Sequence, residues 1–136
     1  MAEAVFRDLV EKEGLSSNFA IASAGTGGWH AGERPHAGTQ LILRKNQIDI
    51  GNMRAKQLTR SDIREYDTII AMDAENVADI QAILGRRVPR LLEFAPKGFP
   101  ADVPDPYYTG GFDQVYQLVL AGCKGLLAAI RERENI

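Results

Sequence analysis

The chain has 136 residues, of which 45% are hydrophobic and 25% are charged, and its formal net charge is -2. These values are typical of a globular protein, so we expect residues 1–136 to form a single domain with its own core. The small net charge gives no reason to expect broad attraction to nucleic acid or acidic membranes, and no apolar run reaches the length of a membrane span.

Residues with metal-binding or redox chemistry are rare, since the chain has one cysteine and two histidines. One cysteine cannot form an internal disulfide, which fits a reducing compartment. The first eight residues carry charges throughout and do not resemble a signal peptide, so we predict a cytoplasmic protein. The cysteine and the histidines lie far apart without zinc-ligand spacing, and we predict neither a metal site nor a cofactor.

In the first half of the chain, segments with helix-like and strand-like patterns follow one another. The expected elements are a helix at 1–13, a strand at 19–24, a glycine-rich loop at 25–32, a helix at 35–45 and a short helix beginning after Thr59 or Ser61. The first helix is unusual because its apolar face begins at Met1 and no Ser, Thr, Asp or Asn precedes it as a cap. This start favours missing sequence upstream, although a frayed terminus is the alternative.

The second half continues the alternation and ends in a long helix. The expected elements are a strand at 67–72, a helix from Asp73 to Leu84 ended by Gly85, a strand at 88–94, a loop with four prolines at 95–111 and a helix at 112–133. The apolar run Thr68–Met72 is typical of a buried parallel strand. The alternation predicts an α/β fold, a three-layer sandwich with a parallel sheet. Such a domain normally opens with a strand that leads into its first helix, and this chain opens with the helix.

Cys123 is the one candidate for a nucleophilic thiolate. A cysteine phosphatase holds the phosphate oxygens with loop N–H groups and with an arginine six positions after the cysteine. Here Ala129 occupies that position, and the next arginine is Arg131. Cys123 also lies within the apolar stripe of the last helix, which further includes Val115, Leu118, Val119, Leu126, Leu127 and Ile130. We therefore predict that Cys123 is a core residue.

Asp105 is the strongest candidate for acid chemistry. It lies between Pro104 and Pro106, which restrict its backbone, and Tyr107 and Tyr108 follow directly. A rigid acid beside aromatic rings suits proton donation to a leaving oxygen on an aromatic substrate. The alternative is a turn aspartate with packed tyrosines. The glycines of the 25–32 loop do not match the dinucleotide-binding spacing, so a nucleotide-binding module is only weakly indicated.

Several motifs resemble those of the low-molecular-weight protein tyrosine phosphatases, in the order in which that family has them. They are Met1-Ala2-Glu3-Ala4, Ser23-Ala24-Gly25-Thr26 with Trp29-His30, Asp67 through Asp73 with Asn76, and Val103-Pro104-Asp105-Pro106-Tyr107-Tyr108 with Gly110-Gly111-Phe112 and Val115-Tyr116. The resemblance spans nearly the whole chain, and the Asp-Pro-Tyr-Tyr loop is its most distinctive part.

The resemblance implies a fold like that of type I phosphatases and a role for each matching residue. Asp105 would be the general acid, and Ser23 would hydrogen-bond the phosphate loop and support it. Trp29, Tyr107 and Tyr108 would flank the entrance and stack on a phosphotyrosine ring. The substrate would be a phosphotyrosine protein or a small aryl phosphate. The Cys-x5-Arg loop, ending in Ser-Pro, and the central first strand should precede Met1, so we expect a truncated chain that lacks both.

Without a thiolate and a phosphate loop, we expect no phosphatase activity from this chain alone. Loss of a central strand would remove burial worth roughly 6–12 kcal/mol, comparable with the stability of a whole domain. The chain is then a truncation, or its remaining strands close up, or a second copy fills the gap in a homo-oligomer. The alternative function is a non-catalytic binding or regulatory protein on the same scaffold. Arsenate reduction needs further cysteines and is disfavoured.

Overall fold

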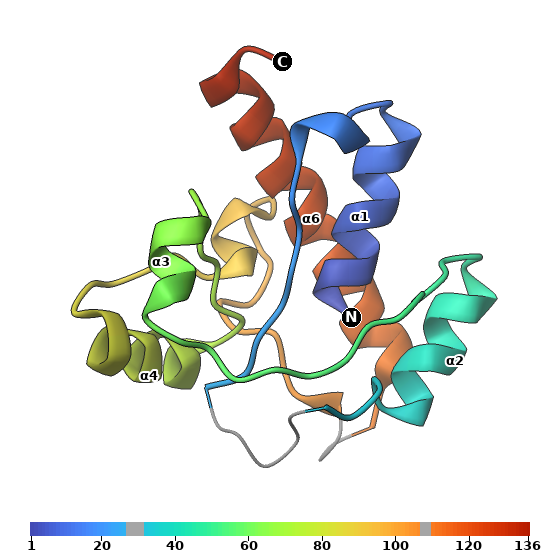
Figure 1. Cartoon of the computed structure of the whole chain (residues 1–136). Helices are drawn as coiled ribbons and strands as arrows, with labels where there is room; N and C mark the ends of the chain where they lie inside the picture. The colour runs from blue at the N-terminus through green and yellow to red at the C-terminus, as the bar shows by residue number, and fades with distance from the viewer. Residues whose placement is uncertain (27–31, 107–109) are drawn as a thin grey trace.

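The computed structural model describes residues 1–26, 32–106 and 110–136 (Figure 1). Its elements are α1 (Ala2–Lys12), the 3-10 helix η1 (Ser16–Asn18), α2 (Ala37–Lys45), α3 (Ser61–Glu65), α4 (Ala74–Leu84), the 3-10 helix η2 (Leu91–Phe94) and α6 (Phe112–Glu134). The long helix α6 packs against α1, α2 and η2. No helix within these three ranges is long and apolar enough to cross a membrane.

The main hydrophobic core forms around α6. Its best-buried side chains come from α1, α2, η2 and α6 and include Val5, Leu43, Leu91 and Cys123. A smaller cluster joins Ile80 of α4 to Ala71 and Val88. The α6 stripe predicted from the sequence is therefore confirmed: five of its seven residues (Val115, Val119, Cys123, Leu126 and Leu127) are buried, and Leu118 and Ile130 are half-buried.

The predicted helices are present, and their ends have local causes. The Oδ1 of Asp73 accepts a hydrogen bond from the Asn76 N–H at 2.8 Å and caps α4, which ends at Gly85 with φ +72°. Helix α2 begins at Ala37, two residues later than predicted, where the Nδ1 of His36 accepts a hydrogen bond from the Gly38 N–H at 3.0 Å. The first turn of α1 has no side-chain cap, as the sequence indicated.

The prediction of an α/β sandwich with a parallel sheet is wrong for the residues described. None of the three expected segments, 19–24, 67–72 and 88–94, forms a β-strand there. Parallel pairing is limited to two single-residue bridges, one between Gly25 and Gln57 and one between Ala71 and Arg90. Figure 1 accordingly draws residues 19–24 and 67–72 as plain trace, and the third segment ends in the 3-10 helix η2.

The bridge at Ala71 shows why a longer ladder does not form beside residues 88–94. Ala71 donates its N–H to the Pro89 carbonyl at 2.9 Å and accepts from the Leu91 N–H at 2.8 Å. The next bond of a parallel ladder would need an N–H from Pro89, which proline lacks. On the other side, η2 begins at Leu91, and the Glu93 N–H is already bonded to the Arg90 carbonyl at 3.1 Å. The apolar pattern of 88–94 therefore marks buried residues without marking a strand.

Candidate active site

Asp105 is the predicted acid, and it lies exposed in the loop that leads from η2 to α6. Pro104 and Pro106 flank it and fix the backbone φ on both sides. Of the residues that the resemblance assigns to the entrance, Trp29, Tyr107 and Tyr108 fall outside the described residues. Their roles stay predictions, and Asp105 and Ser23 are the two site residues whose surroundings can be described.

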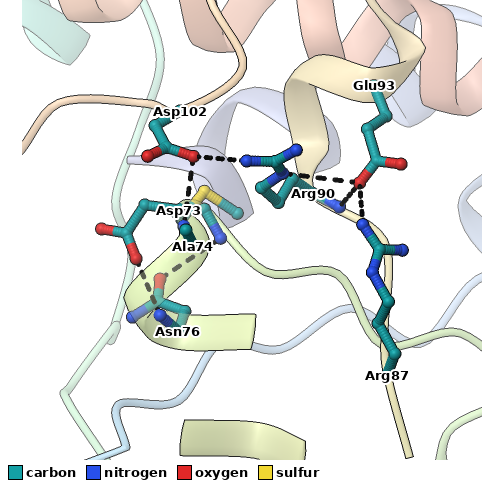
Figure 2. Close-up of polar contacts among 8 residues, drawn as sticks. Asp73, Ala74, Asn76, Arg87, Arg90, Glu93 and Asp102 are labelled. Carbon is teal, nitrogen blue, oxygen red and sulfur yellow. Dashed lines mark hydrogen bonds and ion pairs between the residues drawn. The ribbon is translucent and has the colours of Figure 1, made fainter. Parts of the chain in front are cut away.

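The loop is tied to the start of α4 immediately before Pro104. Val103 is buried and donates its N–H to the Met72 carbonyl at 2.9 Å. The Oδ1 of Asp102 accepts a hydrogen bond from the Ala74 N–H at 3.1 Å, in the first turn of α4 (Figure 2). An acceptor with negative charge is favourable at this position, because the first N–H groups of a helix have no partner within the helix.

Arg90 makes the third link to this loop. Its Nη1 donates to the same Asp102 Oδ1 at 3.0 Å, so one carboxylate oxygen joins α4 to the segment before η2 (Figure 2). Glu93 in turn holds Arg90, since its Oε2 accepts the Arg90 N–H at 2.5 Å and lies 3.7 Å from the Arg90 Nε. The backbone N–H of Arg90, with the charges of Arg87 and Arg90, lowers the pKa of the Glu93 carboxyl.

Ser23 faces the first turn of α1. Its hydroxyl donates to the Glu3 Oε1 at 2.6 Å, while Glu3 also accepts from Arg7 Nη2 at 2.6 Å. Arg7 donates onward to the Ile21 carbonyl at 3.1 Å. These bonds fix residues 21–23 against the N-terminal end of α1, where the acidic Glu3 also suits the helix dipole. A pocket of about 700 Å³ lies on the same side, between α1 and residues 47–56.

Helix α4 connects the two parts of the candidate site. Thr26 donates its hydroxyl to the Asp79 Oδ2 at 3.1 Å, which joins the end of the segment that carries Ser23 to α4. The loop that carries Asp105 is joined to the first turn of the same helix through Asp102. The structure thus fixes Ser23 against α1 and the loop that carries Asp105 (the acid loop) against α4. Thr26 links the two regions.

Cys123 is a core residue, as predicted. It lies in the middle of α6 with 1% of its surface exposed, and its Sγ points to the Ala2 carbonyl at 3.8 Å. Burial raises the pKa of its thiol from the ordinary value of 9.0 to about 12. A thiol in this state is protonated at neutral pH and is a poor nucleophile.

Sequence reasoning missed the residues that anchor the acid loop. Arg90 and Asp102 lie twelve residues apart and meet only because η2 and the following loop fold back toward α4. Neither residue belongs to a recognisable spacing, and nothing in the periodicity of residues 88–94 distinguishes a loop anchor from a solvent-exposed arginine. The proline before Arg90 was the one local sign that the strand pattern would be interrupted.

Comparison with known proteins gives the same family over the whole chain. The sequence profile described as "Low molecular weight phosphotyrosine protein phosphatase" matches residues 1–135. The chain is 46% identical over 140 residues to the low molecular weight protein-tyrosine-phosphatase YfkJ of Bacillus subtilis, covering 100% of this chain and 90% of YfkJ. It is 39% identical over 139 residues to PtpA of Staphylococcus aureus, covering 100% of this chain and 88% of PtpA.

Solved structures agree with this comparison. The crystal structure of YfkJ from Bacillus subtilis superposes with a TM-score of 0.93 at 47% identity, covering 97% of this chain and 86% of that one. A phosphatase from Streptococcus pyogenes superposes with a TM-score of 0.79 at 33% identity, covering 94% of this chain and 81% of that one. This chain belongs to the low molecular weight phosphotyrosine protein phosphatase family.

Proposed function

We propose that this chain supplies the general acid and the substrate entrance of a protein tyrosine phosphatase. Asp105 is the acid, Trp29, Tyr107 and Tyr108 stack on the aromatic ring of the substrate, and Ser23 supports the phosphate loop. The proposal is supported by membership of the family and by the way in which Pro104 and Pro106 restrict the backbone on each side of an exposed carboxyl group. The substrate is a phosphotyrosine protein or a small aryl phosphate.

The reaction in this proposal begins with a cysteine thiolate in a Cys-x5-Arg loop. The thiolate forms an S–P bond, the bond from phosphorus to the aryl oxygen breaks, and Asp105 gives its proton to that oxygen so that a neutral phenol leaves. Water then attacks phosphorus and gives a proton to the Asp105 carboxylate, and the S–P bond breaks, which releases phosphate and restores both the thiolate and the protonated acid. A reducing compartment suits such a thiolate, which is why we propose a cytoplasmic location.

One observation carries the proposal that these 136 residues do not complete the cycle alone. Their single cysteine is Cys123, which is buried in α6 with a pKa raised to about 12 and has Ala129 six positions further on. It therefore has neither the exposed thiolate nor the arginine that the reaction requires. We propose that activity depends on a strand and a Cys-x5-Arg loop, ending in Ser-Pro, joined ahead of Met1.

The experiment compares the 136-residue chain with a loop-extended chain, in which such a strand and loop precede Met1. Hydrolysis of an aryl phosphate is measured for both proteins. We expect turnover from the loop-extended chain only, and we expect it to vanish when the loop cysteine is changed to serine. The Cys123→Ala variant of the loop-extended chain is the matched control and should keep its activity.

Two results would refute the proposal. Turnover by the 136-residue chain would show that no added loop is needed. A folded loop-extended chain without turnover would favour a binding or regulatory role for this scaffold.

A further inference from the structure

The loop that carries Asp105 has three bonded links just before Pro104. One is a backbone bond, in which the Val103 N–H donates to the Met72 carbonyl at 2.9 Å, and the second is the bond from the Ala74 N–H to the side-chain Oδ1 of Asp102 at 3.1 Å. The third is the ion pair of Arg90 and Asp102 at 3.0 Å. Asp102 takes part in two of these links through the same oxygen, Oδ1, so its side chain is held in one orientation (Figure 2).

The position of Asp102 is transmitted to Asp105 by a stiff stretch of chain. Val103 is buried and bonded, and Pro104 has a fixed φ and restricts the backbone of the residue before it. Pro106 restricts Asp105 in the same way. The bond of Val103 and the two prolines therefore limit how far the Asp105 backbone can move independently of Asp102.

Arg90 is partly shielded from water, and the side chain of its partner Asp102 is 47% exposed. The Arg90 side chain is 24% exposed, and its Nε is buried and makes no hydrogen bond among the described residues. The Oε2 of Glu93 accepts the Arg90 N–H and lies 3.5 Å from the Arg87 Nη2, which fixes the turn at η2. A shielded guanidinium of this kind interacts with a carboxylate more strongly than a fully solvated one does.

We propose that Arg90 and Asp102 are positioning residues that hold Asp105 where it donates its proton to the leaving oxygen. This inference rests on the proposed function, because it assigns these residues to the same acid step. In this proposal both residues act through Asp105 and not by contact with the substrate. Their effect is to keep the carboxyl of Asp105 within hydrogen-bonding reach of the aryl oxygen, and small misplacements of such a group reduce rates strongly.

The first test needs only the 136-residue chain. Amide hydrogen exchange is measured for Val103 and Ala74 in the parent and in Arg90→Met, with Arg131→Met as the matched control because its 3.3 Å ion pair with Glu13 lies near the far end of α6. We expect exchange at both amides to rise about tenfold in Arg90→Met and to stay unchanged in the control. Unchanged exchange at Val103 in Arg90→Met would overturn the inference.

The second test separates positioning from general structural damage. In the loop-extended chain, the phenolate of phenyl phosphate needs a proton in order to leave, whereas the dinitrophenolate of dinitrophenyl phosphate leaves readily without one. We expect Arg90→Met and Asp102→Asn to lower kcat/KM, which reports the step that releases the aryl oxygen, by about 10- to 100-fold for phenyl phosphate and by less than about 3-fold for dinitrophenyl phosphate. Arg90→Lys, which keeps the charge, should recover part of the phenyl phosphate rate.

The outcomes distinguish the two proposals. Equal losses with both substrates in an active parent would overturn the positioning inference and leave the proposed function intact. A parent loop-extended chain that is folded and hydrolyses neither substrate would refute the proposed function, and the catalytic part of the inference with it.

Discussion

The chemical state of Cys123 allows a quantitative prediction about its reactivity. With a pKa of about 12, the folded thiol is ionised to roughly one part in ten thousand near pH 8, compared with roughly one part in ten at the ordinary value of 9.0. The thiolate fraction is therefore lower by about a thousandfold, before the burial of the sulfur is considered. Modification then requires local or global opening of α6.

The assay follows modification of Cys123 by a chromogenic disulfide reagent in native buffer and in guanidinium. We expect the native reaction to be at least about a thousandfold slower than the unfolded one. The matched control is Lys124→Cys in a Cys123→Ala background, which places a thiol at the next, exposed position of the same helix and should react at close to the unfolded rate. Native labelling of Cys123 within about tenfold of the unfolded rate, in a protein whose helical signal is intact, would refute the assignment of a buried, protonated thiol.

Three further predictions concern stability. The free energy that Cys123 contributes to folding is complete below pH 9 and falls as pH rises toward 12, because the thiol ionises above its ordinary pKa of 9.0 when unfolded and only near 12 when folded. In urea titrations, the parent should therefore lose up to about 1.4 kcal/mol of unfolding free energy per pH unit relative to Cys123→Ala. Gly125→Ala places a Cβ 1.8 Å from the Phe94 carbonyl oxygen, so thermal unfolding should show a loss of about 3 kcal/mol or more, whereas the exposed Lys124→Ala should change stability by less than about 0.5 kcal/mol. Asp73→Ala removes the cap of α4 and should cost about 1 kcal/mol in urea unfolding, with an undiminished stability contradicting the cap.

The helices were predictable from sequence because their signals are local. An aspartate cap and a glycine with positive φ define α4, and apolar spacing defines the buried face of α6. The predicted sheet failed because strand formation depends on partners far away in sequence. Thr68–Met72 has the composition of a buried strand, yet Ala71 finds a parallel partner at Arg90 alone. Pro89 and the turn at η2 prevent the next bonds of that ladder.

For the candidate site, the sequence names residues whose catalytic roles stay predictions. Asp105 and Ser23 could be named because they belong to distinctive motifs, and Cys123 could be set aside by counting six residues onward. Sequence alone did not show the partner of Ser23, which is Glu3 of α1. Arg90 was missed for the same reason as the sheet register, since its bond to Asp102 is a product of tertiary folding.

The most direct test is to find which sulfur carries phosphate during turnover. The 136-residue chain and the loop-extended chain are mixed with an aryl phosphate, quenched in acid within the first turnover and analysed by peptide mass spectrometry for phosphocysteine. We predict phosphate on the loop cysteine of the loop-extended chain and none on Cys123 in either protein. Phosphocysteine at Cys123 would contradict the view that these residues provide the acid for the reaction without its nucleophile.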